Sequence, residues 1–130
     1  MRLKDKSSID LPSDIDYEVY GLCNILNCLP DTQTFESCCG HQKQPCMIFI
    51  QTTSIGVMKR LGRVVNRNYS DGKWELLVDD MDIRHEGVVL WLRTKEVLTD
   101  YTLKESIREL INSIEYWFAD TFDEYFDGKL

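Results

Sequence analysis

The stretch that decides the fold runs from Thr32 to Gln51 and reads TQTFESCCGHQKQPCMIFIQ. It contains two runs typical of β-strands, residues 34–39 and 47–51, separated by a loop with a glycine and a proline. This spacing predicts a β-hairpin. Its loop would bring the densest set of reactive side chains in the chain into one small volume, namely Cys38, Cys39, His41 and Cys46.

A helix is expected ahead of the hairpin. It would begin near Ser13 or Asp14, whose side chains can cap free backbone N–H groups, and end at Pro30. Its apolar face would consist of Val19, Leu22, Cys23, Leu26 and Leu29. Cys23 lies on this face and is expected to be buried, whereas Cys28 lies off it and is expected to be partly exposed.

A second helix is expected after the hairpin, capped by Thr53 or Ser54 and running to about Asn66. The predicted buried side is Ile55, Met58, Leu61, Gly62 and Val65. We expect Gly56 and Gly62 to mark close packing against a sheet. Four basic side chains are predicted on the opposite side, Lys59, Arg60, Arg63 and Arg67. They form either a solvated face or a contact surface for RNA.

Two more strands and a long helix complete the pattern. The strands are predicted at residues 73–79 and 88–93. Thr102 and Glu105 match a capping box, which predicts the start of the last helix. Its apolar stripe would comprise Leu103, Ile107, Leu110, Ile111, Ile114, Trp117, Phe118, Phe122 and Tyr125.

The predicted fold is therefore an α+β domain, with a four-stranded sheet, three helices and the element order α-β-β-α-β-β-α. Residues 1–12 are expected to form a loose lead-in, and residues 13–130 a single domain. The second helix links the two strand pairs. If the strands it connects are parallel, the crossover should be right-handed.

Composition restricts the partners and the location that we expect. The net charge of −7 makes binding to generic DNA or to an anionic membrane unfavourable. The sequence contains no apolar run of the ~20 residues that a membrane span needs, and its charged start does not resemble a secretory signal. A cytoplasmic location is expected, in which the five cysteines stay reduced.

Three interpretations of the hairpin loop remain open. Zinc is a candidate cofactor, because three or four thiolate and imidazole groups can hold it tetrahedrally. The ligands would be Cys38, Cys39, His41 and Cys46. Cys38 and Cys39 are neighbours, so they can share an ion only if the strand has ended at Gly40.

A catalytic site is the second interpretation, with Cys38 or Cys39 as nucleophile and His41 as base. Glu36 would lie on the same face as Cys38 and could orient the pair. Ser37 and Gly40 complete the site. In the third interpretation the hairpin is structural. Phe35, Ile48 and Ile50 would contribute to the core, the cysteines would fill small spaces, and His41 would cap a turn.

The run from Thr34 to His41, followed by Pro45 and an apolar strand, resembles small bacterial and bacteriophage proteins that carry a Glu-Ser-Cys-Cys-Gly-His signature. In that family a helix with a cysteine and an asparagine precedes the signature, as residues 23–29 do here. Family members have glycine where this chain has Gln42. The resemblance covers about residues 15–51 and implies a bacterial or phage origin without assigning an activity.

The loop is also faintly similar to the wybutosine-synthesis tRNA methyltransferase family, whose signature is Ser-Ser-Cys-Ser-Gly-Arg. Ser37, Cys38 and Gly40 match this signature, while three positions depart from it: Glu36, Cys39 and His41. The similarity implies a role connected with RNA or S-adenosylmethionine.

Two classes of function follow from these patterns. The first is a binding or accessory module with a Cys/His site in the hairpin loop. The second is a small enzyme that uses the Cys-Cys-Gly-His loop in zinc-dependent, thiol-based or RNA-modifying chemistry. The sequence does not identify a substrate.

Overall fold

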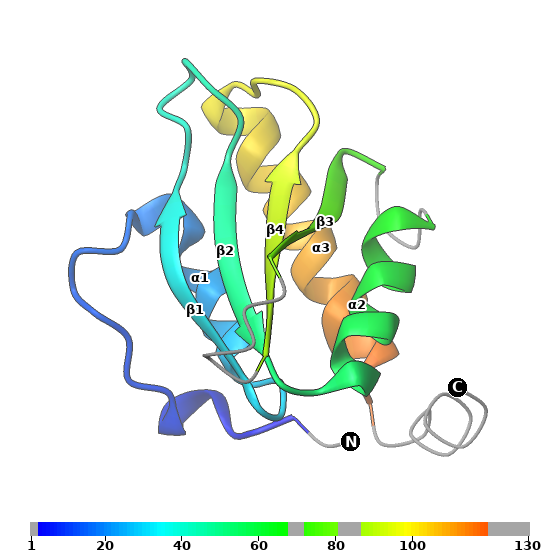
Figure 1. Cartoon of the computed structure of the whole chain (residues 1–130). Coiled ribbons are helices and arrows are strands. Elements are labelled where there is room, and N and C mark those ends of the chain that lie inside the picture. Colours follow the sequence, from blue (N-terminus) through cyan, green and yellow to red (C-terminus); the bar gives the residue numbers. More distant parts are fainter. Residues whose placement is uncertain (1–2, 68–71, 81–86, 120–130) are drawn as a thin grey trace.

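A computed structural model describes residues 3–67, 72–80 and 87–119 of the chain (Figure 1). The elements are η1 (Lys6–Ser8), α1 (Tyr17–Asn27), β1 (Thr32–Cys38), β2 (Met47–Thr52), α2 (Ile55–Asn66), β3 (Trp74–Asp80), β4 (Val88–Thr94) and α3 (Asp100–Trp117). The predicted α+β class and the order α-β-β-α-β-β-α are confirmed. A short 3-10 helix, η1, precedes them within the predicted lead-in.

The four strands form one sheet in the order β1-β2-β4-β3, and every neighbouring pair is antiparallel. The predicted hairpin is confirmed by the pairing of β1 with β2. Because β2 and β3 are each antiparallel to β4, they run parallel to one another with β4 between them. The segment containing α2 therefore connects two parallel strands that are not neighbours.

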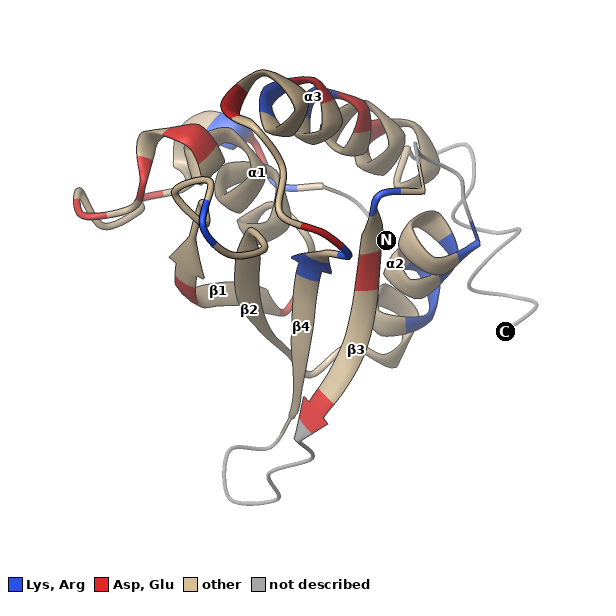
Figure 2. Ribbon diagram, turned by 90° about the horizontal axis from the view of Figure 1, so that it is seen from above, with Lys and Arg blue, Asp and Glu red and all other residues tan. Residues whose placement is uncertain are grey.

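The helices lie on one side of the sheet (Figure 2). In this view α1 and α3 lie over the sheet, and α2 lies beside β3. The core fills the space between the two layers, where Ile48, Ile50, Leu90 and Leu92 are almost fully buried. Successive strand residues point to opposite faces, so the alternate positions of β2 and β4 face away from the helices.

A buried hydrogen bond joins the sheet to the last helix. Trp74 in β3 is fully buried, and its Nε1 donates to Oγ of Ser106 in α3 at 2.7 Å. An indole N–H buried without a partner would cost about 1–3 kcal/mol. Ser106 therefore makes this position in the core suitable for tryptophan.

The first helix begins later than predicted, and Cys28 is not exposed. Asp16 is the N-cap residue in place of Ser13 or Asp14. Cys23 and Cys28 both have 0% exposure, so the expectation of burial is confirmed for Cys23 and the expectation of partial exposure was wrong for Cys28. The segment before the helix explains the difference. The backbone N–H of Lys4 donates to the carbonyl of Cys28 at 2.8 Å. Four apolar residues of the same segment pack against the core: Leu3, Ile9, Leu11 and Ile15.

The second helix has the predicted cap, since Oγ of Ser54 accepts the N–H of Val57. Its predicted buried side is correct at Leu61 and Val65, and Met58 packs against the core, but the other two predicted residues differ. Ile55 is 63% exposed, and an added Cβ at Gly62 would meet nothing within 4 Å, so close packing is not the reason for that glycine. The residues that are buried are Val57, Arg60, Leu61, Val64 and Val65. The helix packs against α3 as well as the sheet, and the residue pattern of α2 alone does not reveal this second contact.

Arg60 was wrongly placed on the basic outer face. It is fully buried, and its guanidinium lies over the ring of Phe118, 5.2 Å from the centroid. Lys59 and Arg67 are exposed, and Arg63 is partly buried. The basic surface that was predicted to contact RNA therefore lacks one of its four charges.

The last helix starts three residues earlier than the capping box suggested. Thr99 is the N-cap residue, and its Oγ1 accepts the N–H of Thr102, which lies within the helix. The predicted stripe is buried at Leu103, Ile107, Leu110, Ile114 and Phe118. The predicted members Phe122 and Tyr125 lie outside the described residues. No helix in the described ranges has the length and apolar character needed to cross a membrane.

Candidate metal centre

The loop between β1 and β2 depends on an unusual backbone conformation. Gly40 has φ +88°, and the next two residues, His41 and Gln42, have φ +52° and +60°. The carbonyl of Gly40 accepts the N–H groups of Lys43 and Gln44. A Cβ at Gly40 would lie 2.2 Å from the carbonyl oxygen of Gln44. Only glycine suits this position, and the turn that it permits fixes where His41 projects.

Asp16 joins this loop to the first helix. It lies immediately before α1, and its Oδ2 accepts the backbone N–H of Cys39 at 3.0 Å. This backbone hydrogen bond is the largest cause that lowers the pKa of Asp16 below its usual value. The side chain is 28% exposed. Asp16 is therefore a carboxylate at neutral pH, held between the helix and the end of β1.

Three side chains of metal-binding type converge here. One ligand atom from each of Asp16, Cys38 and His41 lies within 4.8 Å of the others. Nε2 of His41 is 3.6 Å from Oδ2 of Asp16. Sγ of Cys38 accepts from the backbone N–H of Gly40 at 3.4 Å and from Nε2 of Gln44 at 3.6 Å. These contacts hold a carboxylate, a thiol and an imidazole around one point.

Two of the predicted cysteine ligands do not belong to this group. Cys39 is 6% exposed, and burial is the main cause that raises its pKa. Its Sγ lies 3.4 Å from Nδ1 of His41. Cys46 is 2% exposed, and burial raises its pKa strongly. Its N–H donates to Oγ1 of Thr94, which anchors it to β4. Both thiols stay protonated at neutral pH, so the geometry gives no support to Cys39 as a nucleophile.

The other predicted site residues divide between the two faces of β1. Glu36 is exposed and lies opposite Phe49 of β2. It lies on the same face of β1 as Cys38, as predicted, because the two are separated by one residue in the paired register. Ser37 lies on the opposite face, toward the helices, because it pairs with the buried Ile48 of β2. Neither Glu36 nor Ser37 contributes an atom to the group of three.

Asp16 is the member of the site that the sequence analysis missed. Its signal was indirect. A helix followed by an antiparallel strand returns the chain to where the helix began, so the residue before α1 must lie near the end of β1. The predicted start near Ser13 or Asp14 places Asp16 in the first turn of the helix, whereas in the structure it is the N-cap residue.

The fold and the site together define a small α+β domain with one helical layer and a candidate metal centre at the end of its edge strand. No family model, no curated protein and no solved structure matches this chain.

Proposed function

We propose that this chain is a small binding module that holds one zinc ion through Asp16, Cys38 and His41. The convergence of their three ligand atoms within 4.8 Å of one another supports the proposal. The three residues come from the start of α1, the end of β1 and the loop that follows. An ion at this point would tie these three segments together.

The donor set suits zinc in type and in charge. Zinc is bound in proteins by thiolate sulfur, imidazole nitrogen and carboxylate oxygen at about 2.0–2.3 Å. A doubly positive ion with one carboxylate, one thiolate and one neutral imidazole makes an uncharged centre. The carboxylate of Asp16 is already ionised at neutral pH, because its pKa is lowered by the N–H of Cys39. The thiol of Cys38 would lose its proton on binding, so affinity should rise with pH.

Cys39 has a supporting place in this centre. Its sulfur lies beside Nδ1 of His41, while Nε2 of the same ring faces Asp16. A proton on Nδ1 would be shared with that sulfur and would leave the lone pair of Nε2 for the ion. Such outer contacts fix the tautomer and orientation of a histidine ligand. Cys39 therefore orients the imidazole without ligating the metal.

The second candidate function is a small zinc-dependent enzyme. Three protein ligands leave one position of a tetrahedral ion for water, and 63% of the His41 side chain is exposed to solvent. Water bound to zinc in such an open site ionises near pH ~7. A closed structural site would instead fill the fourth position with a further protein ligand.

A metal titration tests the proposal. Protein freed of metal by a chelator should take up close to one equivalent of Zn²⁺ in competition with a chromogenic chelator. Co²⁺ bound in the same site should show a sulfur-to-metal charge-transfer band that disappears in Cys38→Ser. We expect His41→Ala and Asp16→Asn each to weaken binding by at least about tenfold. Cys46→Ala is the matched cysteine control and should keep the full stoichiometry.

Two results would reject the proposal. One is a folded protein that takes up no zinc, and the other is binding lost in Cys46→Ala but kept in Cys38→Ser. The same cobalt protein separates the two candidate functions. A bound water would change the visible spectrum with a midpoint near pH ~7, whereas a closed site would give a constant spectrum across that range.

A further inference from the structure

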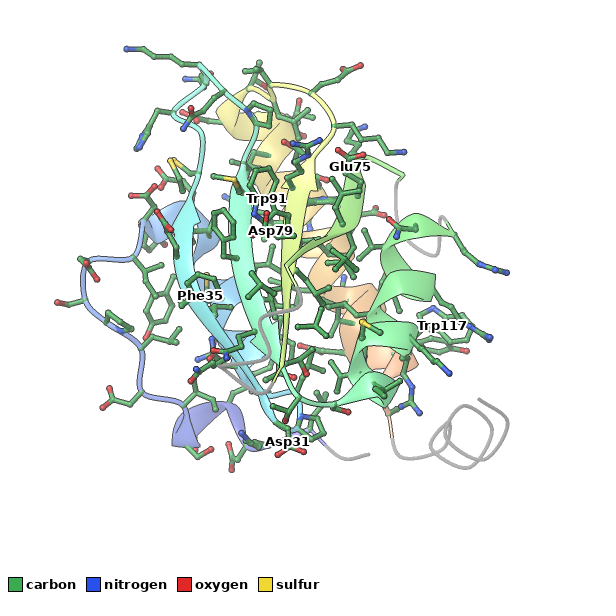
Figure 3. The ribbon with its side chains drawn as sticks, in the orientation of Figure 1. Asp31, Phe35, Glu75, Asp79, Trp91 and Trp117 are labelled. Atoms are coloured by element: carbon green, nitrogen blue, oxygen red, sulfur yellow. The ribbon has the colours of Figure 1, made fainter. Side chains whose placement is uncertain are left out.

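The face of the sheet that points away from the helices carries a row of large apolar side chains. Four residues form this row, which we call the open face: Phe35 of β1, Phe49 of β2, Trp91 of β4 and Leu77 of β3. Phe35 and Trp91 are labelled in Figure 3. The helices lie on the other side of the sheet (Figure 2). Phe35 is 53% exposed, so the expectation that it contributes to the core was wrong, and Leu77 is 40% exposed. A row of this kind across a whole sheet marks an interaction surface.

The rings of the open face are arranged by their neighbours. The centroids of Phe35 and Phe49 are 5.6 Å apart, and Phe49 meets Trp91 edge to face at 5.0 Å. Leu77 is paired with Trp91 in the register of β3 and β4. A β-bulge between Thr34 and Glu36 makes Phe35 the extra residue of β1. Regular strand alternation places Phe49, Trp91 and Leu77 on this face, and the bulge adds Phe35 from the edge strand.

The charges within the strands are mostly negative. Among the strand side chains that the structure describes, three are acidic, Glu36, Glu75 and Asp79, and one is basic, Arg93. That cation is already engaged, since its Nε donates to Glu75 at 2.6 Å and its guanidinium lies 5.5 Å from the ring of Trp91. Glu36 lies opposite Phe49, so a carboxylate borders the aromatic row on β1.

A cavity of about 310 Å³ continues the open face at its edge. It lies between β1 and the segment that precedes α1. Its lining includes Phe35 and Glu36 from β1 and Asp14 and Ile15 from the preceding segment. The cavity is therefore bordered by two carboxylates and shares Phe35 with the aromatic row. It has room for a long side chain with a positive end.

We infer that the open face binds a basic, partly apolar segment of a partner protein. Apolar side chains of that segment would cover Phe35, Phe49 and Trp91, and a lysine or arginine would enter the cavity toward Asp14 and Glu36. Arg93 over Trp91 shows that this row accommodates a cation on an aromatic ring. Charge complementarity favours this occupant over the alternatives. The carboxylates would repel the phosphates of RNA, and two copies of the same acidic face would repel each other.

A pair of designed peptides provides the probe. The first is an 18-residue amphipathic peptide of leucine and lysine, and the second has glutamate at every lysine position. Fluorescence anisotropy of each labelled peptide would be measured with the full chain at low and physiological salt. We expect the basic peptide to bind, with weaker binding at higher salt, and the acidic peptide to show no saturable binding.

Variants locate the binding on the open face. Phe35→Ser removes an apolar anchor, and Glu36→Lys reverses a charge. Each should weaken the affinity for the basic peptide by at least about tenfold. The matched controls are Tyr101→Ser and Glu109→Lys on α3, where both residues are exposed. These controls should leave the affinity within about twofold. Circular dichroism melts of all four variants would establish that they fold.

Several outcomes would overturn the inference. Equal affinity for the two peptides would show that the binding is not specific for a basic segment. If the α3 control variants lost as much affinity as Phe35→Ser and Glu36→Lys, the open face would not be the binding site. Tighter binding of a uridine oligonucleotide, lost in Phe35→Ser, would assign the face to RNA. Dimerisation in sedimentation experiments, abolished by the same variant, would assign it to a second copy of this chain. Absence of any binding by the basic peptide would also reject the proposed chemistry.

Discussion

The guanidinium of Arg60 lies 5.2 Å from the centroid of the Phe118 ring, inside the contact between α2 and α3. Arg60 has 0% exposure and Phe118 has 1%. A buried cation needs compensation, and the electron-rich face of an aromatic ring provides part of it. This pair explains why the buried side of α2 includes an arginine.

The Arg60–Phe118 pair predicts a measurable coupling. A double-mutant cycle with Arg60→Met and Phe118→Leu should give about 0.5–2 kcal/mol in the free energy of unfolding, measured by urea denaturation. Phe118→Leu alone should destabilise the protein more than Arg60→Met, because it leaves the charge without its ring. Arg67→Met on the exposed part of α2 is the control and should change stability little. Additive effects of Arg60→Met and Phe118→Leu would contradict the pairing.

Two glycine substitutions should act in opposite directions. Gly40→Ala would place a Cβ against the carbonyl of Gln44 at a positive φ, so we expect a loss of at least about 1–3 kcal/mol in unfolding free energy. The Cβ added by Gly62→Ala would lie in the middle of α2 with no atom within 4 Å. This substitution should stabilise the protein by about 0.5–1 kcal/mol, because alanine has the higher helix propensity. Denaturant titration of both variants checks the pair. A stable Gly40→Ala protein would show that the loop does not need its left-handed conformation.

Buried thiols predict that stability falls in alkaline solution. Burial raises the pKa of Cys46 above its ordinary value of 9.0. A raised folded-state pKa means that its stabilising contribution is complete below pH 9.0 and is lost as pH rises toward the folded value. The free energy of unfolding should therefore decrease above about pH 9. At neutral pH the free energy of unfolding of Cys46→Ala should be lower than that of the unchanged protein, because the substitution leaves a small cavity. Above about pH 9 this free energy should decrease less steeply in Cys46→Ala. Parallel curves for the two proteins would exclude Cys46 as a cause.

Alkylation should distinguish Cys38 from the other thiols. Cys38 is partly exposed, whereas the other four cysteines are buried. Iodoacetamide at neutral pH should label Cys38 first, as resolved by mass spectrometry, and label the others only when the protein opens. Zinc bound at the proposed site should slow the labelling of Cys38 several-fold. Labelling of Cys39 at a similar rate would contradict the burial that the structure shows.

The sequence was most informative where a local pattern and the fold agree. The hairpin, the order of elements and the Ser54 cap were predictable because strand alternation, turn residues and capping act over a few residues. The buried side of α2 was predicted only in part, because α3 lies far along the chain and Arg60 is buried in the contact with it. Asp16 was missed for the same reason, since its role depends on where β1 ends. The local strand patterns also could not show which face of the sheet the helices cover.

The strand order has a consequence for how this chain folds during synthesis. β4 lies between β2 and β3, although it is the last of the four strands to leave the ribosome. Until residues 88–94 have emerged, the hairpin of β1 and β2 has an unpaired edge and β3 has no neighbouring strand. Unpaired edges are sites of aggregation, so the nascent chain is most vulnerable during the interval in which α2 and β3 are made. The insertion of β4 closes the sheet in a single late step.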